Sequence, residues 1–183
     1  MALIQANTGW LRQALSLLAR IGDDVYSSVP GSLAPHRAGA HLRHILDFYE
    51  CFLDGLDSAH IDYDARKRDE SIATSRVDAA AKIRDLIARL ESAPLLRGDA
   101  LVWVRLEAAD AELIPDPYMT SSVARELQSL SSHTVHHFAL IAMTLNAHGV
   151  EVDSDFGVAP STLRYQAAQR DQAAASNRKT KAA

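Results

Sequence analysis

The chain has 183 residues, of which 48% are hydrophobic and 23% are charged, and this composition indicates one globular domain or one domain plus a tail. Its net charge of −4 argues against a general nucleic-acid binder, since neutralising phosphates requires a basic surface. No apolar run approaches the roughly 20 residues that a membrane span needs. The single cysteine, Cys51, excludes an intrachain disulfide and suits a reducing compartment. We therefore expect a cytoplasmic protein without a nucleic-acid or membrane partner.

Four long segments are predicted to be amphipathic helices, because apolar residues recur in them at three- and four-residue steps. In chain order they cover residues 7–27, 36–56, 75–92 and 120–148. The fourth is the clearest. It begins near Thr120 or Ser121, either of which can cap a helix, and Gly149 is a good stop signal.

The remaining segments connect or follow these helices. Residues 57–74 are polar and charged and are predicted to be a solvated connection, while residues 100–107 alternate with the period of two that is typical of a strand. This alternation allows a short β-hairpin between the third and fourth helices. Residues 166–183 are predicted to be a polar, partly disordered tail, which leaves residues 1–165 as the folded domain. Four such helices indicate an all-α helical bundle, and the long connections leave the order of the helices open.

The fourth predicted helix carries a histidine motif that suits a metal ion. His133 and His137 lie one turn apart, about 40° from each other on the helical wheel, so their imidazoles can reach one common point. His136 lies roughly 100° from His137 and is predicted either to face the surface or to lie behind the ligands. On the second predicted helix, either His41 or His44 could reach a site shared with this pair, and the wheel does not choose between them.

Several neighbouring residues have a structural and a chemical interpretation. Thr134 stands where the glutamate of a zinc-protease motif would stand, so zinc peptidase chemistry is not supported. Glu126 and Asp47 could each be a ligand, a base or a partner that holds a histidine, and we favour the last role for both. Packing roles are predicted for Cys51, Trp10 and Trp103.

Three stretches of this sequence resemble the DinB/YfiT-like family of metal-binding helical bundles. They are residues 39–47 (Gly-Ala-His-Leu-Arg-His-Ile-Leu-Asp), residues 125–127 followed by 132–137 (Arg-Glu-Leu and Ser-His-Thr-Val-His-His), and residues 155–163 (Asp-Phe-Gly-Val-Ala-Pro-Ser-Thr-Leu). The likeness extends from about residue 7 to residue 165.

The resemblance implies a four-helix bundle of up-down-down-up order that holds a divalent metal ion, nickel or zinc, through three histidines. Carried over to this sequence, the ligands are His44, His133 and His137, with His44 preferred over His41 because it matches the family's stretch. Related sequences often have a further histidine where Phe48 stands here. The resemblance also implies a homodimer.

Three neutral histidines leave at least one coordination position open, which is typical of catalytic rather than structural metal sites. The leading hypothesis is therefore a metal-dependent hydrolase or an S-transferase that uses a low-molecular-weight thiol, activities that the resemblance also implies. The alternative is a non-catalytic, dimeric, stress-related module that binds metal. A third hypothesis is a bundle whose histidines bind nothing. The sequence names no substrate, beyond a small molecule or a thiol.

Overall fold

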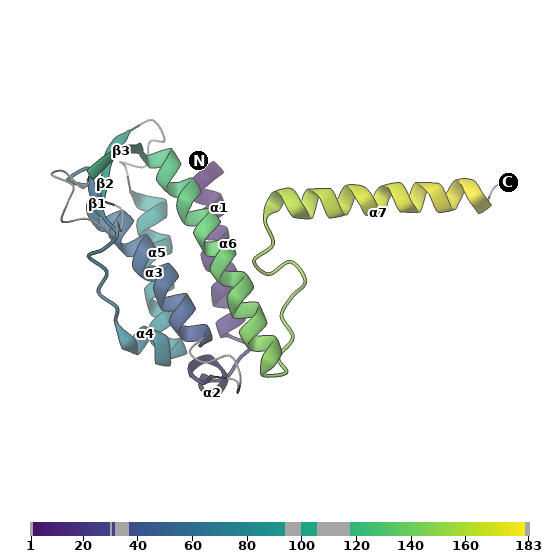
Figure 1. Cartoon of the computed structure of the whole chain (residues 1–183), viewed down its shortest axis with the longest axis horizontal. Helices are drawn as coiled ribbons and strands as arrows, with labels where there is room; N and C mark the ends of the chain where they lie inside the picture. Colours follow the sequence, from purple (N-terminus) through teal and green to yellow (C-terminus); the bar gives the residue numbers. More distant parts are fainter. Residues whose placement is uncertain (1, 30, 32–36, 94–99, 106–117, 182–183) are drawn as a thin grey trace.

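The computed structural model is mostly helical and carries one small three-stranded sheet (Figure 1). It describes residues 2–29, 31, 37–93, 100–105 and 118–181, with side chains described up to residue 172. In chain order its elements are α1 (Ala2–Leu18), α2 (Asp23–Ser27), α3 (Ala38–Gly55), β1 (His60–Asp62), α4 (Glu70–Thr74), α5 (Arg76–Ser92), β2 (Leu101–Arg105), β3 (Tyr118–Ser122), α6 (Val123–Ala147) and α7 (Pro160–Lys181). The prediction of an all-α protein is confirmed in its coarser form, since the described chain is mostly helical but also carries this sheet. None of the helices in the described ranges combines the length and the apolar character needed to cross a membrane.

Four long helices, α1, α3, α5 and α6, pack against one another, with α1 and α6 running in one direction and α3 and α5 in the other (Figure 1). Two ion pairs follow the parallel course of α3 and α5: Lys82 donates to Glu50 at 2.6 Å, and farther along both helices Arg89 donates to Asp54 at 2.6 Å. Because parallel neighbours cannot be joined by a tight turn, the long connection after α3 must return along the molecule before α5 begins.

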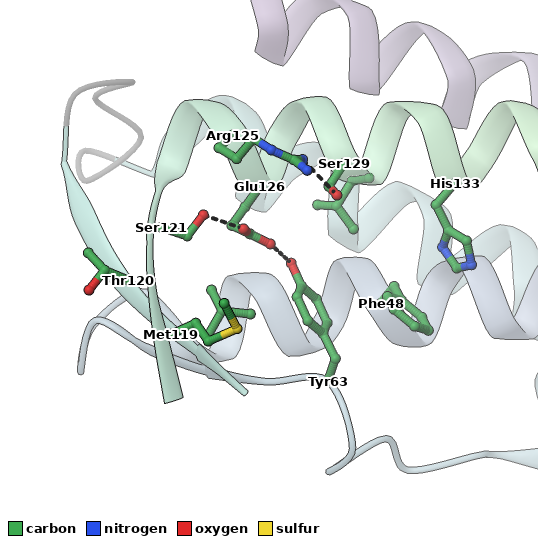
Figure 2. A pocket seen from close by; sticks show the side chains of 11 residues that line it. Phe48, Tyr63, Met119, Thr120, Ser121, Arg125, Glu126, Ser129 and His133 are labelled. Atoms are coloured by element: carbon green, nitrogen blue, oxygen red, sulfur yellow. Dashed lines mark hydrogen bonds between the residues drawn. The ribbon is translucent and has the colours of Figure 1, made fainter. Parts of the chain in front are cut away.

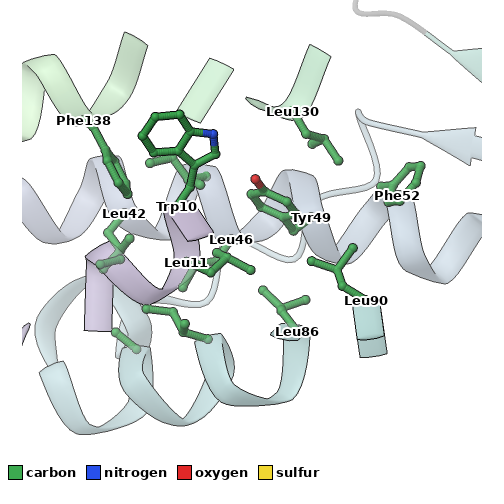
Figure 3. Close-up of a cluster of buried hydrophobic side chains, with 14 of the residues drawn as sticks. Trp10, Leu11, Leu42, Leu46, Tyr49, Phe52, Leu86, Leu90, Leu130 and Phe138 are labelled. Carbon is green, nitrogen blue, oxygen red and sulfur yellow. The ribbon is translucent and has the colours of Figure 1, made fainter. Parts of the chain in front are cut away.

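The core lies between these helices and consists of large apolar side chains (Figure 3). The largest fully buried ones are Tyr26, Tyr49, Phe52, Phe138, Leu11, Ile45, Leu46, Ile61, Ile83, Leu86, Leu90 and Leu127. Most of them recur along their helices at three- and four-residue steps, so each helix turns one apolar stripe inward. A buried polar network crosses this core, in which the Tyr49 hydroxyl donates to Asn7 Oδ1 at 2.7 Å and the Asn7 amide donates to the carbonyl oxygen of Leu127 at 3.0 Å.

The ends of α5 and α6 follow local capping chemistry. The Ser75 hydroxyl accepts a hydrogen bond from the backbone N–H of Asp78, and the Ser122 hydroxyl accepts one from Arg125 at the start of α6. Gly149 adopts a positive φ of 75° just beyond the end of α6, where a residue with a side chain would be strained. The predicted third helix is confirmed almost residue for residue, and the predicted fourth helix begins two to three residues later than expected.

The first predicted helix, over residues 7–27, is wrong as a single element. The chain forms α1 and α2 with a break around Gly22, which has extended backbone and lies between them. This turn lets Tyr26 of α2 point into the core, where its hydroxyl donates to the carbonyl oxygen of Ile72 at 2.7 Å. The break therefore interrupts the helix for about one turn, and it allows the aromatic ring of Tyr26 to be buried.

The interpretation of residues 57–74 as a solvated connection is also wrong in part. This segment contributes β1 and α4 and buries Ile61, Tyr63 and Ile72. At Gly39, the first turn of α3 approaches the backbone of α4 closely: a Cβ there would lie 2.1 Å from the carbonyl oxygen of Ala73. The connection is therefore packed against the helices at both of its ends, while most of residues 65–71 are exposed.

The sheet has the order β1-β2-β3, with β1 parallel and β3 antiparallel to β2. The predicted strand, β2, and its antiparallel pairing with β3 are confirmed, while β1 was not predicted. Val102 and Val104 face inward, and Trp103 faces outward with 44% of its surface exposed. The packing role predicted for Trp103 is therefore wrong, whereas Trp10 is buried and donates its indole N–H to Ser131.

The chain after α6 first folds back and then leaves the body of the protein. Gly157 has a positive φ of 67° and packs against Phe138, on which the ring of Phe156 stacks at 4.5 Å between centroids. The helix α7 then extends outward (Figure 1), and its described side chains are mostly exposed. The predicted boundary after residue 165 falls inside this helix, and the division into a domain and a disordered tail stays a prediction.

Candidate metal centre

Three histidines from two antiparallel helices meet at one point. His44 of α3 and His133 and His137 of α6 each place one ring nitrogen within 4.8 Å of the others, and we call these three residues the histidine cluster. The Nε2 atoms of His44 and His133 are 3.1 Å apart. All three side chains are half-buried, and the cluster could bind a metal ion. These are the three residues that the sequence analysis selected.

His41 lies one turn before His44 and faces the other end of the cluster. Its Nδ1 atom is 3.1 Å from Nδ1 of His137, and the two ring centroids are 5.3 Å apart. Two pairs of histidines therefore face each other across α3 and α6, and we call them the two rungs: His44 with His133, and His41 with His137. The convergent set contains His44, and His41 contacts the member of this set that lies farther along α6, His137. This register was not readable from the wheel of either helix.

His136 was predicted either to face the surface or to lie behind the ligands, and the first of these positions is confirmed. Its side chain is exposed, and its ring meets that of His137 edge-on at 5.1 Å between centroids. A residue next to the cluster in sequence is thus outside it in space, because successive helical residues point about 100° apart.

The surroundings of the cluster favour neutral imidazoles. Burial lowers the pKa of His44 and of His133 to about 4, and that of His137 to about 3. In each case neighbouring imidazoles lower the pKa further, because one protonated ring repels protons from the next. Neutral imidazole is the form that ligates metals, so the cluster is in its ligand state at neutral pH.

Aromatic rings from α3 and the following connection cover one side of the cluster. The Phe48 ring lies 4.8 Å from that of His44 and 4.3 Å from that of His133, and it stacks on Tyr63 at 5.1 Å. The guanidinium carbon of Arg66 lies 4.9 Å from the centre of the Phe48 ring. Its charge also contributes to lowering the pKa of His44 and His133. Neither Tyr63 nor Arg66 was identified from the sequence, because the three residues of β1 are too few to show a strand pattern next to them.

A pocket of about 410 Å³ opens beside the cluster, with His133 in its wall (Figure 2). It lies where the sheet meets α3 and α6. The residues that line it are Phe48, Tyr63, Val104, Met119, Thr120, Ser121, Arg125, Glu126, Ser129, Leu130 and His133. Its volume lies at the lower end of the range for small-molecule sites, and its walls are mainly apolar with a few polar groups.

Among the described residues Glu126 is hydrogen-bonded to Tyr63 and Ser121 and to no histidine, so the role favoured for it is wrong. Its Oε2 atom accepts a hydrogen bond from the Tyr63 hydroxyl at 2.8 Å, and its Oε1 atom accepts one from Ser121 at 2.5 Å (Figure 2). Both donors come from the strands and the connection rather than from the helices, which is why the wheel of α6 could not reveal them. The carboxylate is buried and lines the pocket at a distance of two helical turns from His133.

Two further candidates are poor choices for chemistry. Burial raises the pKa of the Cys51 thiol to about 11, so the thiol remains protonated at neutral pH, and it is half-buried against the core. Burial also raises the pKa of Asp47, which belongs to α3 and is almost fully buried. Among the described residues, Asp47 has no hydrogen bond to a ring of the histidine cluster. The role favoured for Asp47 therefore stays a prediction.

Comparison with known proteins shows no family for the chain. No protein-family model matches it, and no solved structure matches it significantly. A curated protein named FK506-binding protein 5, from Rhizopus delemar, is 30% identical over 107 residues, which is 57% of this chain and 27% of that protein. The chain thus spans about a quarter of the relative's length, so the match carries neither a family nor an activity.

Proposed function

We propose that the protein is a metal-dependent enzyme whose histidine cluster holds one divalent ion, nickel or zinc, in a four-helix bundle of the DinB/YfiT-like type. The observation that carries the proposal is the convergence of three imidazole nitrogens within 4.8 Å beside a pocket of about 410 Å³. The directions of the four long helices support the up-down-down-up order of that type, because α1 and α6 run one way and α3 and α5 run the other way.

The residues fit such an ion in chemistry and in spacing. Imidazole suits both zinc and nickel. Two nitrogens bound at about 2.0–2.1 Å to a tetrahedral ion would lie roughly 3.3–3.4 Å apart. The nitrogens of His44 and His133 are 3.1 Å apart, so binding would require only small movements of these rings. The pKa values of all three rings are lowered by burial, which removes competition from protons at neutral pH.

The pocket favours an enzyme over a non-catalytic module. A bound ion would act there as a Lewis acid. Phe48 packs against one side of the cluster, Tyr63 stacks on the Phe48 ring, and the pocket beside His133 has the volume of a small-molecule site. The proposed reaction is a hydrolysis or an S-transfer. Because the Cys51 thiol stays protonated at neutral pH, S-transfer would take its sulfur from a free low-molecular-weight thiol.

Metal analysis and turnover together test this proposal. Protein purified without a histidine tag should contain close to one nickel or zinc ion per chain, and the ion should be lost in His44→Ala and His133→Ala. The matched control is His136→Ala, which removes an exposed histidine one residue from the cluster. Failure of the wild type to take up either metal would refute the site. Equal turnover of wild type and His133→Ala on esters and thiol acceptors would refute the enzyme.

The proposal includes a homodimer in the cytoplasm, as the resemblance and the single cysteine suggest. Sedimentation of the metal-loaded and chelated protein tests the dimer. The competing proposal of a non-catalytic, dimeric, stress-related module requires that chelation dissociate the dimer while no reaction is found.

A further inference from the structure

The pocket beside the histidine cluster has two chemically different ends. His133 lies at one end, and Glu126 lies nearer to β3, at the other end of the stretch of α6 that lines the pocket (Figure 2). Seven residues separate them, which corresponds to about 10 Å along the helix axis. The wall between them is apolar and aromatic, with Phe48, Tyr63 and Leu130. A ligand that fills the pocket would therefore have an apolar middle and two distinct ends.

Glu126 is a buried carboxylate that is stabilised by neutral groups. The residue is 7% exposed, and its two oxygens accept one hydrogen bond each, from Tyr63 and from Ser121. A carboxylate offers about four acceptor positions. The two hydroxyl groups thus orient the Glu126 carboxylate, but being neutral they do not cancel its negative charge. A buried charge of this kind favours a cationic or strongly donating partner.

The neighbouring cation lies at the exposed rim of the same pocket. Arg125 is exposed, and its guanidinium donates to the Ser129 hydroxyl at 3.0 Å. Its charge is therefore screened by solvent, whereas the charge of Glu126 is not. Of these two charges, the buried carboxylate should determine which ligands bind.

We propose that the Glu126 end of the pocket binds a protonated amine, so that the site takes small molecules with a metal-binding group at one end and an ammonium group at the other. The proposal rests on the proposed function, since it requires a metal ion at the histidine cluster. The ammonium group donates to the acceptor positions of Glu126 that Tyr63 and Ser121 leave open. The apolar middle contacts Phe48 and Leu130, and the metal-binding group meets the ion.

Three benzohydroxamates that differ only in the para substituent test this inference by calorimetry on the metal-loaded protein. Hydroxamates chelate divalent ions, and a para substituent on benzohydroxamate projects away from the chelating group along the pocket. We expect 4-aminomethylbenzohydroxamate to bind about tenfold or more tightly than 4-methylbenzohydroxamate, because a hydrogen bond between charged groups adds to binding. We expect 4-carboxybenzohydroxamate to bind most weakly, since its charge repels Glu126.

Variants then assign the preference to one residue. In Glu126→Gln the amino and methyl compounds should bind within about twofold of each other, with the metal content unchanged. Glu151→Gln removes an exposed carboxylate that does not line the pocket, and it should retain the wild-type preference. Even if Glu126→Gln does not fold, the ranking of the three compounds on the wild type decides the matter.

The outcomes separate this inference from the proposed function. A protein that takes up no metal overturns both. A metal-loaded protein that binds the three compounds equally, binds none of them, or prefers the carboxylate compound overturns the inference alone. In the last case Arg125 would determine the preference in place of Glu126.

Discussion

The close approach of α3 to α4 at Gly39 makes a sharp prediction for Gly39→Ala. An added Cβ would lie 2.1 Å from the carbonyl oxygen of Ala73, 2.9 Å from its carbonyl carbon and 2.9 Å from Cε1 of Tyr26. Two of these atoms belong to the backbone, and the third belongs to a ring that is 1% exposed. None is the end of a flexible side chain, so α4 must move away from α3 by about 1.3 Å or more to restore an ordinary contact.

The expected loss in the free energy of unfolding of Gly39→Ala is the difference between two opposing effects. Overpacking of a core typically costs about 1–3 kcal/mol. Replacing glycine by alanine within a helix offsets about 0.5–1 kcal/mol of this. Because the clash at Gly39 is with backbone, the cost should lie at the upper end of its range, which leaves a net loss of about 2 kcal/mol. For a chain of this size that loss lowers the melting temperature by about 4–8 °C.

Urea denaturation followed by circular dichroism at 222 nm measures this change, with Gly9→Ala as the matched control. Gly9 lies inside α1, and a Cβ there would meet no atom within 4 Å. Alanine at that position should raise the free energy of unfolding by about 0.5–1 kcal/mol. The reasoning is refuted if Gly39→Ala is as stable as the wild type, or if both variants shift in the same direction.

Three further predictions concern the histidine cluster. The folded pKa values of about 3–4 lie below the value near 6.5 in the unfolded chain, so the unfolded state binds more protons between these values. The metal-free protein should therefore lose stability as the pH falls from 7 to 4, and urea unfolding at both pH values that shows no loss would contradict the pKa shifts. Nickel or zinc at 100 times its Kd should add about 2.7 kcal/mol, which raises the melting temperature by about 5–11 °C in the wild type and not in His133→Ala. In Phe48→His a fourth imidazole would stand beside His44 and His133, so competition with a chelator should show tighter metal binding and assays should show lower turnover; unchanged affinity would mean that this ring cannot reach the ion.

The predictions that succeeded rest on local signals. The start of α5 depends on the hydroxyl of Ser75 and the end of α6 on Gly149, and both act within a few residues. At the start of α6 the cap is Ser122 and not the predicted Thr120 or Ser121, because these two residues pair in β3. The convergence of His133 and His137 is likewise a property of one helix, because residues four apart share a face.

The predictions that failed depend on which elements meet. A three-residue strand such as β1 has too few residues for a periodic pattern, and its formation requires β2, which lies about 40 residues later. The outward face of Trp103 is set by the side of the sheet that the helices cover, and the alternation of β2 does not reveal it. The partners of Glu126 come from distant segments for the same reason.

The choice between His41 and His44 required the register of α3 against α6. Each residue faces a histidine of α6, and only the position of one helix along the other decides which of them joins the convergent set. The resemblance to a known family supplied this register in place of a physical argument, which the two helical wheels alone could not provide.

The two rungs of histidines also join parts of the chain that are far apart in sequence. His44 and His133 are separated by 89 residues, and His41 and His137 by 96. An ion bound by the histidine cluster can link α3 to α6 only after these two helices have docked. The entropy of closing the long loop between them is therefore lost before the ion contributes. Such an ion stabilises the native state more than the transition state for folding. Its main kinetic effect would be to slow unfolding, and metal supply would then control how long the folded chain persists.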